Sequence, residues 1–128
     1  MKLLDKIQTK AGAVSLQENG LLRIEISKTD EITIPNIKEY LEVIKELGGG
    51  KAFCNIIIIE EFVHVDNETR KFNATEEVNI YTIAEALVIK STALKIVGNF
   101  YIRFNKPARP TKMFSNEEDA TNWLMKFL

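Results

Sequence analysis

Cysteine and histidine are almost absent from this chain, with one of each among 128 residues. The single cysteine, Cys54, excludes a disulfide within the chain, and the apolar run around it predicts a buried thiol in a reducing compartment. One cysteine and one histidine also exclude the usual zinc sites, which need several such ligands at short spacing. We therefore expect a cytoplasmic protein without a metal or a cofactor.

Long hydrophobic runs are absent too, because no segment approaches the roughly 20 apolar residues that cross a bilayer. The first residues carry charges at Asp5, Lys6 and Lys10 in place of a sustained apolar region, so we expect no signal peptide. The formal net charge is −1, which gives no strong positive field. We therefore expect no binding to nucleic acid and no stable membrane insertion.

What the chain does contain is enough apolar material for one core. Hydrophobic residues make up 45% of the sequence and charged residues 27%. At this length, such a balance fits a single domain over residues 1–128 that buries about two-thirds of the surface of its unfolded chain.

The first half of the sequence predicts a hairpin, a helix and a buried strand. Apolar residues alternate on both sides of Asn19 and Gly20, a pair that is typical of a tight hairpin turn. Residues 33–50 have apolar side chains at helical spacing, with Pro35 in the first turn and three glycines at the end. The isoleucine-rich run 51–60 does not alternate, which predicts a central strand that is covered on both faces.

A short helix and a second buried strand are predicted next. Residues 65–79 have a mostly polar surface, which favours a half-exposed helix with Asp66 or Asn67 as its N-cap. Residues 84–90 form another largely apolar run and predict a strand that is buried beside the first.

Two further helices are predicted in the last third of the chain. Ser91 is the cap candidate of the first, and Pro107 cannot continue it. Its helical period predicts a core stripe of Ala93, Val97, Phe100, Tyr101 and Phe104. After a short strand or loop, the last helix begins with a capping box from Ser115 to Glu118 and docks through an apolar face.

The order of these elements predicts an α/β fold. Helices alternate with strands after the N-terminal β-hairpin, an order that is typical of parallel strand pairs joined by crossing helices. We therefore expect a mixed, largely parallel central sheet of four to five strands, with about four helices on its faces.

The stretch "GNFYIRFNKPARPTKMF", followed by "EEDATNWL", resembles the small bacterial proteins grouped as STAS/SEC14-like or SpoIIAA-like. The resemblance covers roughly residues 48–128, and before that only the order of elements. It implies a central sheet of four or five strands with helices on its faces. Among its relatives, the anti-sigma-factor antagonists bind proteins under control of phosphorylation, and the SEC14 branch captures an apolar ligand.

The phosphorylation site of those antagonists is degenerate in this chain. The resemblance places their acceptor serine just after an Asp that matches Asp66, at the start of the helix that follows the central strand. Asn67 and Glu68 stand where the serines would be, and Thr69 is the nearest hydroxyl. Asp66 or Asn67 as a helix cap explains this segment; alternatively, Glu68 imitates a permanently modified state at the positive end of the helix.

Catalytic arrangements are not evident. His64 lies two residues from Asp66 without a serine or cysteine nucleophile beside it. Glu60 and Glu61 are adjacent in a predicted strand, so their side chains point to opposite faces. We therefore expect a non-enzymatic domain without catalytic, cofactor-binding or metal-binding residues.

Positive charge is concentrated between Glu85 and Glu117, where no acidic residue occurs. Six of the 17 cations lie there, which leaves 11 cations against 18 acidic residues in the rest of the chain. They are Lys90, Lys95, Arg103, Lys106, Arg109 and Lys112. Such asymmetry favours docking to an acidic surface or side-by-side self-association.

Two functions remain open at this point. The first is a protein-interaction or regulatory module that binds an unknown partner or itself, for example as a homodimer, through Arg103, Lys106, Arg109 and Lys112. The second is a carrier that binds an anionic amphiphile or lipid-like ligand in an apolar cleft rimmed by Arg103 and Lys106. A closely packed core would favour the first function and an apolar pocket the second.

Overall fold

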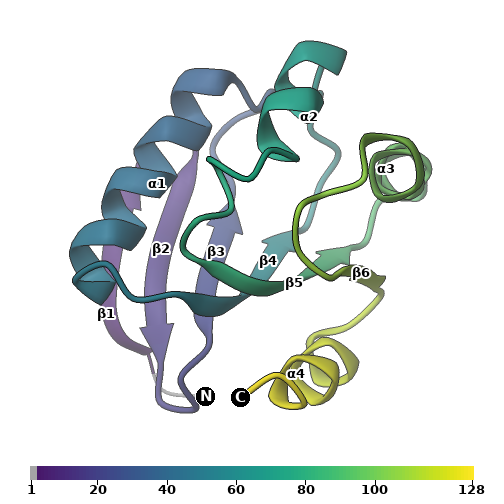
Figure 1. Ribbon diagram of the computed structural model, residues 1–128. Helices are drawn as coiled ribbons and strands as arrows, with labels where there is room; N and C mark the ends of the chain where they lie inside the picture. The colour runs from purple at the N-terminus through teal and green to yellow at the C-terminus, as the bar shows by residue number, and fades with distance from the viewer. Residues whose placement is uncertain (1–2) are drawn as a thin grey trace.

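Six strands form one sheet in which the spatial order follows the chain, from β1 to β6 (Figure 1). The structure is a computed structural model that describes residues 3–128, with side chains from Lys6 onward. The strands are β1 (Leu3–Thr9), β2 (Gly12–Gln17), β3 (Leu22–Ile26), β4 (Phe53–Ile59), β5 (Thr82–Ile89) and β6 (Thr111–Phe114). The α-helices are α1 (Ile34–Gly48), α2 (Asn67–Asn73), α3 (Thr92–Phe100) and α4 (Glu117–Met125), and a π-helical segment, η1 (Tyr101–Asn105), continues α3.

The sheet is mixed, as predicted. The β1–β2 and β2–β3 pairs are antiparallel, and the β3–β4, β4–β5 and β5–β6 pairs are parallel. Gly20 lies in the turn between β2 and β3 with φ +88°, a conformation that glycine adopts without strain, so the hairpin at Asn19 and Gly20 is confirmed.

The predicted number of strands, four to five, is wrong because β1 was not expected. Its sequence, LLDKIQT, places polar residues where a half-buried strand would have apolar ones. Backbone pairing with β2, from Leu3 opposite Gln17 to Thr9 opposite Gly12, makes this segment a strand all the same.

Three helices cover one face of the sheet and α4 covers the other. The parallel strands β3 to β6 are neighbours in the sheet in chain order. Right-handed crossover connections between them therefore place α1, α2 and α3 on the same face. Their apolar residues, including Ile37, Phe72 and Leu94, pack in one core with Ile24 and Leu87 of the sheet. The chain returns after β6 as α4, which lies apart from the other helices in Figure 1.

The second core lies under α4. Ala120 and Leu124 of α4 are fully buried against small side chains of the sheet, among them Cys54, Ala84 and Ala86. Cys54 is buried and free, as predicted. The docking of the last helix is therefore confirmed.

The first and last helices begin with different caps. The Oγ1 atom of Thr33 accepts a hydrogen bond from the N–H of Asn36 and so caps α1, and Gly49 ends that helix in the left-handed region. The predicted cap of α4, Ser115, is wrong. Asn116 accepts from the N–H of Asp119 at 2.9 Å, because it is the residue that directly precedes the first helical residue.

The predicted core stripe of α3 is also wrong in part. Ser91 caps α3 as expected, but the buried residues are Leu94, Gly98 and Tyr101. The buried side of α3 is therefore rotated from the predicted one. Gly98 explains the rotation because it has no side chain, and a Cβ atom there would lie 2.9 Å from the sulfur of Met113.

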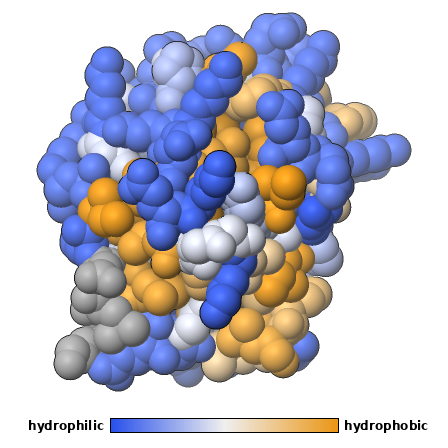
Figure 2. Space-filling model, turned by 60° about the vertical axis from the view of Figure 1, so that its left-hand side comes forward, coloured by the Kyte–Doolittle hydropathy of each residue, from blue (hydrophilic) through white to orange (hydrophobic). Residues whose placement is uncertain are grey.

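Two aromatic residues of the predicted stripe, Phe100 and Phe104, consequently face outward, whereas Tyr101 is buried. Phe100 is 45% exposed and Phe104 62% exposed, and the π-helical turn moves Phe104 further from the α-helical period. Figure 2 shows that hydrophobic side chains reach the surface in patches among hydrophilic ones on the face that it presents. Within the described residues, no helix is both long and apolar enough to span a membrane.

Candidate functional site

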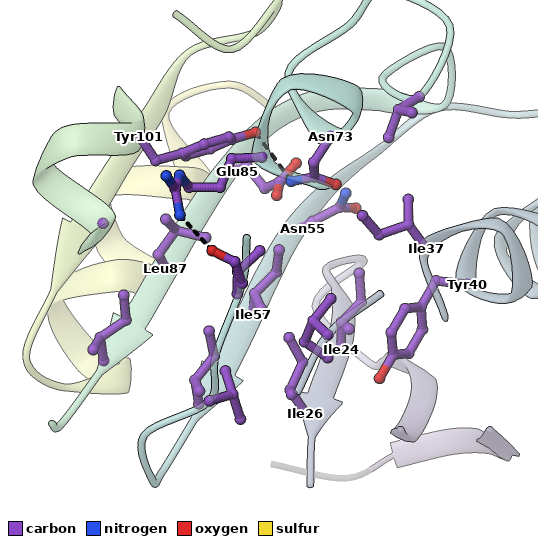
Figure 3. A pocket seen from close by; sticks show the side chains of 18 of the residues that line it. Ile24, Ile26, Ile37, Tyr40, Asn55, Ile57, Asn73, Glu85, Leu87 and Tyr101 are labelled. Carbon is purple, nitrogen blue, oxygen red and sulfur yellow. Dashed lines mark hydrogen bonds between the residues drawn. The ribbon is translucent and has the colours of Figure 1, made fainter. Parts of the chain in front are cut away.

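An apolar cavity of about 160 Å³ lies between the sheet and the helices α1, α2 and α3 (Figure 3). Alternate residues of β3, β4 and β5, including Ile24, Ile57 and Leu87, form one wall. Tyr40 of α1 and Leu94 of α3 belong to the opposite side. The cavity therefore lies within the larger of the two cores.

One end of the cavity is polar. Asn55 and Glu85 are register partners on β4 and β5, so both side chains emerge on the cavity face of the sheet. Asn73 of α2 and Tyr101 of η1 lie at the same end, whereas Ile57 lies toward the other (Figure 3). Strand register and two helical segments thus bring together four polar side chains from distant parts of the sequence.

Hydrogen bonds hold part of this polar end in place. The Nδ2 atom of Asn73 donates to the hydroxyl of Tyr101 at 3.0 Å, and the Nδ2 atom of Asn55 donates to the hydroxyl of Thr82 at 3.0 Å. The Oδ1 atom of Asn55 is buried and has no partner. A buried acceptor without a donor costs free energy.

Glu85 is the main electrostatic feature of the cavity. Burial raises the pKa of its carboxyl group to about 7, although the neighbouring Asn55 amide acts in the opposite direction. Burial and the nearby Glu85 charge also raise the pKa of Tyr101, which therefore stays neutral. No ion pair to Glu85 occurs among the residues that the structure describes. The ionised carboxylate thus lacks a counter-charge.

The cation at the cavity wall is Arg70 of α2. Its Nη1 atom donates to the carbonyl of Val65, and its guanidinium carbon lies 5.5 Å from the centroid of the Phe100 ring. The sequence predicts a cleft rimmed by Arg103 and Lys106, and neither of these lines the cavity. The outward orientation of Phe100 and Phe104 explains the difference, because it places that side of the helix, with Arg103, at the surface.

The residues of the predicted interaction surface have different environments. Arg103 and Lys112 each lie 5.6 Å from a ring centroid, those of Phe104 and Phe114 respectively, and Lys106 is exposed at the end of η1. Arg103 lies in η1 and Lys106 directly follows it, whereas Lys112 lies on β6.

Arg109 has a structural role instead. Its guanidinium forms two hydrogen bonds with Glu76, at 2.6 and 2.8 Å, and its Nε atom donates to the carbonyl of Thr82 at 2.9 Å. These contacts tie the loop before β6 to the segment before β5, so this cation is already engaged within the chain.

The degenerate phosphorylation segment forms a helix start. The Oδ1 atom of Asp66 accepts from the N–H of Thr69 at 2.8 Å, and this bond lowers the pKa of the Asp66 carboxyl group. Asn67 and Glu68 are exposed in the first turn, and Thr69 is only 3% exposed. The Thr69 hydroxyl, the one nearest to the degenerate site, is therefore on a buried residue. Of the two predicted cap candidates, Asp66 and Asn67, Asp66 is the one that caps α2.

The remaining candidates do not converge. His64 is exposed and pairs through its backbone with Glu31, and Glu60 and Glu61 are exposed after β4. Within the described residues, no group of three or more His, Cys, Asp or Glu side chains could hold a metal ion.

Sequence reasoning missed Asn55 and Glu85. Each is a single polar residue inside an apolar run, "CNIIII" and "AEALVI", that predicts a buried strand. That interruption is the signal that could have found them, because a buried strand excludes such residues unless they have a partner.

Comparison with known proteins shows the family and the fold. Residues 14–128 match the family described as a domain of unknown function, DUF7793. A crystal structure of an uncharacterised DUF3478 protein with a SpoIIAA-like fold, from Shewanella loihica, is similar with a TM-score of 0.54 and 12% identity, over 96% of this chain and 92% of that one.

A protein of unknown function from an Arthrobacter species is 24% identical over 92% of this chain and 95% of its own. Its TM-score of 0.30 is too low to indicate a shared fold. No curated protein matches the chain. The chain belongs to the family with the DUF7793 domain and has a SpoIIAA-like fold.

Proposed function

We propose that this protein is a non-enzymatic domain that binds a small, largely apolar ligand in the cavity between the sheet and α1 to α3. The cavity itself is the observation that supports this function, with a volume of about 160 Å³ and mostly aliphatic walls. An apolar cavity of about 150 Å³ is large enough to bind benzene. Apolar walls with a few placed polar groups are also the usual composition of a small-molecule site.

The volume limits the size of the ligand. A molecule of benzene size with one polar substituent fits about 160 Å³, whereas a lipid with long acyl chains does not. Because Arg103 and Lys106 do not line the cavity, Arg70 is the one cation that an anionic head group would find there among the residues with described side chains. These features favour a small apolar ligand over the anionic amphiphile that the sequence suggests.

Toluene binding tests this function. We expect toluene to raise the melting temperature of the protein, because a ligand at ten times its Kd stabilises the folded state by about 1.4 kcal/mol. Ile57→Phe places a ring in the cavity and should abolish the shift. Ile80→Phe, at a side chain that is 58% exposed, is the matched control and should keep it.

Two outcomes would contradict the proposal. The first is the absence of toluene binding to the unmodified protein in ligand-observed NMR at millimolar concentration. The second is equal binding to the unmodified protein and to Ile57→Phe. Val97→Phe, which fills the same cavity from α3, replaces Ile57→Phe if circular dichroism shows that the latter is unfolded.

A second candidate function is self-association through an aromatic-basic patch, defined as Ile96, Phe100, Arg103, Phe104 and Lys106. Three of its members are exposed hydrophobic residues, Ile96 by 68%, Phe100 by 45% and Phe104 by 62%. The rings of Phe100 and Phe104 contact each other in a tilted arrangement, with centroids 4.7 Å apart. The occupant that we favour is the acidic surface of a second copy, since acidic residues outnumber cations 18 to 11 outside the basic stretch.

Sedimentation velocity over a range of concentrations tests this association. We expect a dimer that weakens at least tenfold in the double variant Arg103→Glu, Lys106→Glu and that weakens with added salt. Lys51→Glu, an exposed cation outside the patch, is the control and should leave the dimer unchanged. A monomer at every concentration would exclude this function.

A further inference from the structure

The polar end of the cavity holds a buried carboxyl group without a counter-charge and a buried amide oxygen without a donor. The Asn55 Oδ1 atom is buried without a partner, and the Glu85 carboxyl group is only 9% exposed and has no ion pair within the described part of the chain. The Asn55 amide also forms a hydrogen bond with the Glu85 carboxyl group, but it is neutral and brings no charge. A positively charged ligand therefore complements this end of the cavity.

We propose that the ligand carries a primary amine, whose ammonium group binds the Glu85 carboxylate and the Asn55 Oδ1 atom while its apolar body lies against the isoleucines of β3 and β4. This inference rests on the proposed function and adds the chemical class of the ligand. An ammonium group has three donors and a positive charge, so it can satisfy both acceptors and supply the missing counter-charge.

The charge of Glu85 couples this binding to pH. Without a ligand, the carboxyl group is protonated in a large fraction of molecules near pH 7, because burial raises its pKa to about that value. An ammonium ion binds the ionised form, so the affinity for an amine that stays protonated should rise between pH 6 and pH 8. A neutral ligand of the same shape should show no such rise.

The other titratable groups of the cavity are compatible with an ammonium ion at Glu85. Tyr40 of α1 and Tyr101 of η1 line the cavity, and the raised pKa of each phenol keeps it neutral. Arg109 reaches the carbonyl of Thr82, but its charge is paired with Glu76. Arg70 is the cation within the cavity lining.

Arg70 raises the alternative of an anionic ligand. The guanidinium already donates to the Val65 carbonyl and stacks on Phe100, although its Nε atom has no partner. A carboxylate bound at Arg70 would share the cavity with the ionised Glu85, and two like charges in an apolar site repel each other strongly. The observations therefore favour the amine.

Four probes of nearly the same shape separate these possibilities: benzylamine, benzyl alcohol, toluene and benzoate. Isothermal titration calorimetry at pH 8 should show benzylamine binding at least tenfold more tightly than benzyl alcohol or toluene. Glu85→Gln keeps the shape of the side chain and removes its charge. It should weaken benzylamine binding at least tenfold, abolish the rise in affinity from pH 6 to pH 8, and leave toluene binding unchanged.

Asn55→Leu is the second variant, and it should weaken benzylamine about fivefold without weakening toluene. Circular dichroism checks that both variants fold. Equal affinity for benzylamine and toluene would overturn the amine and leave the proposed function standing. Tightest binding of benzoate would overturn it in favour of Arg70, and binding of none of the four probes would overturn both proposals.

Discussion

On one face of the sheet α4 packs onto a core in which the small side chains of β5 lie beside the isoleucines of β4, whereas on the other face α1, α2 and α3 leave a cavity. Strand β5 contributes to both faces, with Ala84 and Ala86 toward α4 and Leu87 and Ile89 toward the other helices. Small side chains let a helix approach the sheet closely, so the core under α4 can reach the density of a protein interior.

The two faces of the sheet also differ in their buried polar residues. Asn55 and Glu85 interrupt the apolar residues on the cavity face, at the place where three helices meet the sheet. A buried carboxyl group without a counter-charge lowers stability, and an empty cavity does so too. We infer that the face under α4 mainly stabilises the fold. The opposite face contributes less stability, because it contains the cavity and the buried carboxyl group of the proposed binding site.

Two leucines, one from each core, give the strongest test of whether the two cores are packed differently. Leu124 of α4 is fully buried and Leu94 of α3 is 3% exposed, so both lose the same groups on replacement by alanine. We expect Leu124→Ala to lower the free energy of unfolding by about 4 kcal/mol and Leu94→Ala by about 2 kcal/mol, because Leu94 already borders empty space. Urea denaturation measures both values.

Leu128→Ala, at a side chain that is 61% exposed, serves as the control and should change the free energy of unfolding by less than about 0.5 kcal/mol. Equal decreases in the free energy of unfolding for Leu94→Ala and Leu124→Ala would show that the two cores are packed alike, which would contradict the inferred difference between the two faces.

The next largest effect is a dependence of stability on pH. The pKa of Glu85 is raised from 4.5 to about 7 by folding, so the folded chain binds more protons between these values. The free energy of unfolding should therefore fall by roughly 3 kcal/mol as the pH rises through this window. Urea denaturation of the unmodified protein and of Glu85→Gln at intervals from pH 4.5 to pH 8 measures the slope.

Glu85→Gln should remove most of this slope, because a neutral amide does not titrate. Glu117 acts in a different window: Arg23 lowers the pKa of its carboxyl group, so its contribution is present above pH 4.5 and is lost at lower pH. A slope that persists unchanged in Glu85→Gln would assign the effect to other groups.

The smallest effect concerns the start of α4. Asn116→Ala should lower the free energy of unfolding by about 1 kcal/mol, because it removes the side-chain oxygen that accepts from the Asp119 N–H. Ser115→Ala should change it by less than about 0.5 kcal/mol, since its hydroxyl contacts only the exposed Lys95 ammonium group at 3.3 Å. The opposite order in thermal denaturation would restore Ser115 as the cap.

The elements with strong local signals were predictable from the sequence. The turn at Gly20, the helix α1 with its C-cap at Gly49 and the isoleucine-rich strand β4 all follow from local chemistry. β1 was not predictable in this way, because its pairing with β2 compensates for a weak apolar pattern. The orientation of Phe100 and Phe104 depends on Gly98 and on the π-helical turn, and helical periodicity encodes neither.

The candidate site was less predictable than the fold. The sequence suggested an apolar cleft next to the aromatic helix, and the cavity does border α3 and η1. Its polar end depends on the register that places Asn55 beside Glu85 and on the position of Asn73 under Tyr101. These residues are up to 46 positions apart, so only tertiary structure brings them together.

The burial of Cys54 turns the only thiol of the chain into a reporter of motion. Burial raises its pKa, so the thiol is unreactive while Ala120 and Leu124 cover the strand. A thiol reagent can therefore modify it only after α4 lifts from the sheet or the whole domain opens. The rate of modification in native buffer consequently gives the free energy of that opening, without any introduced label.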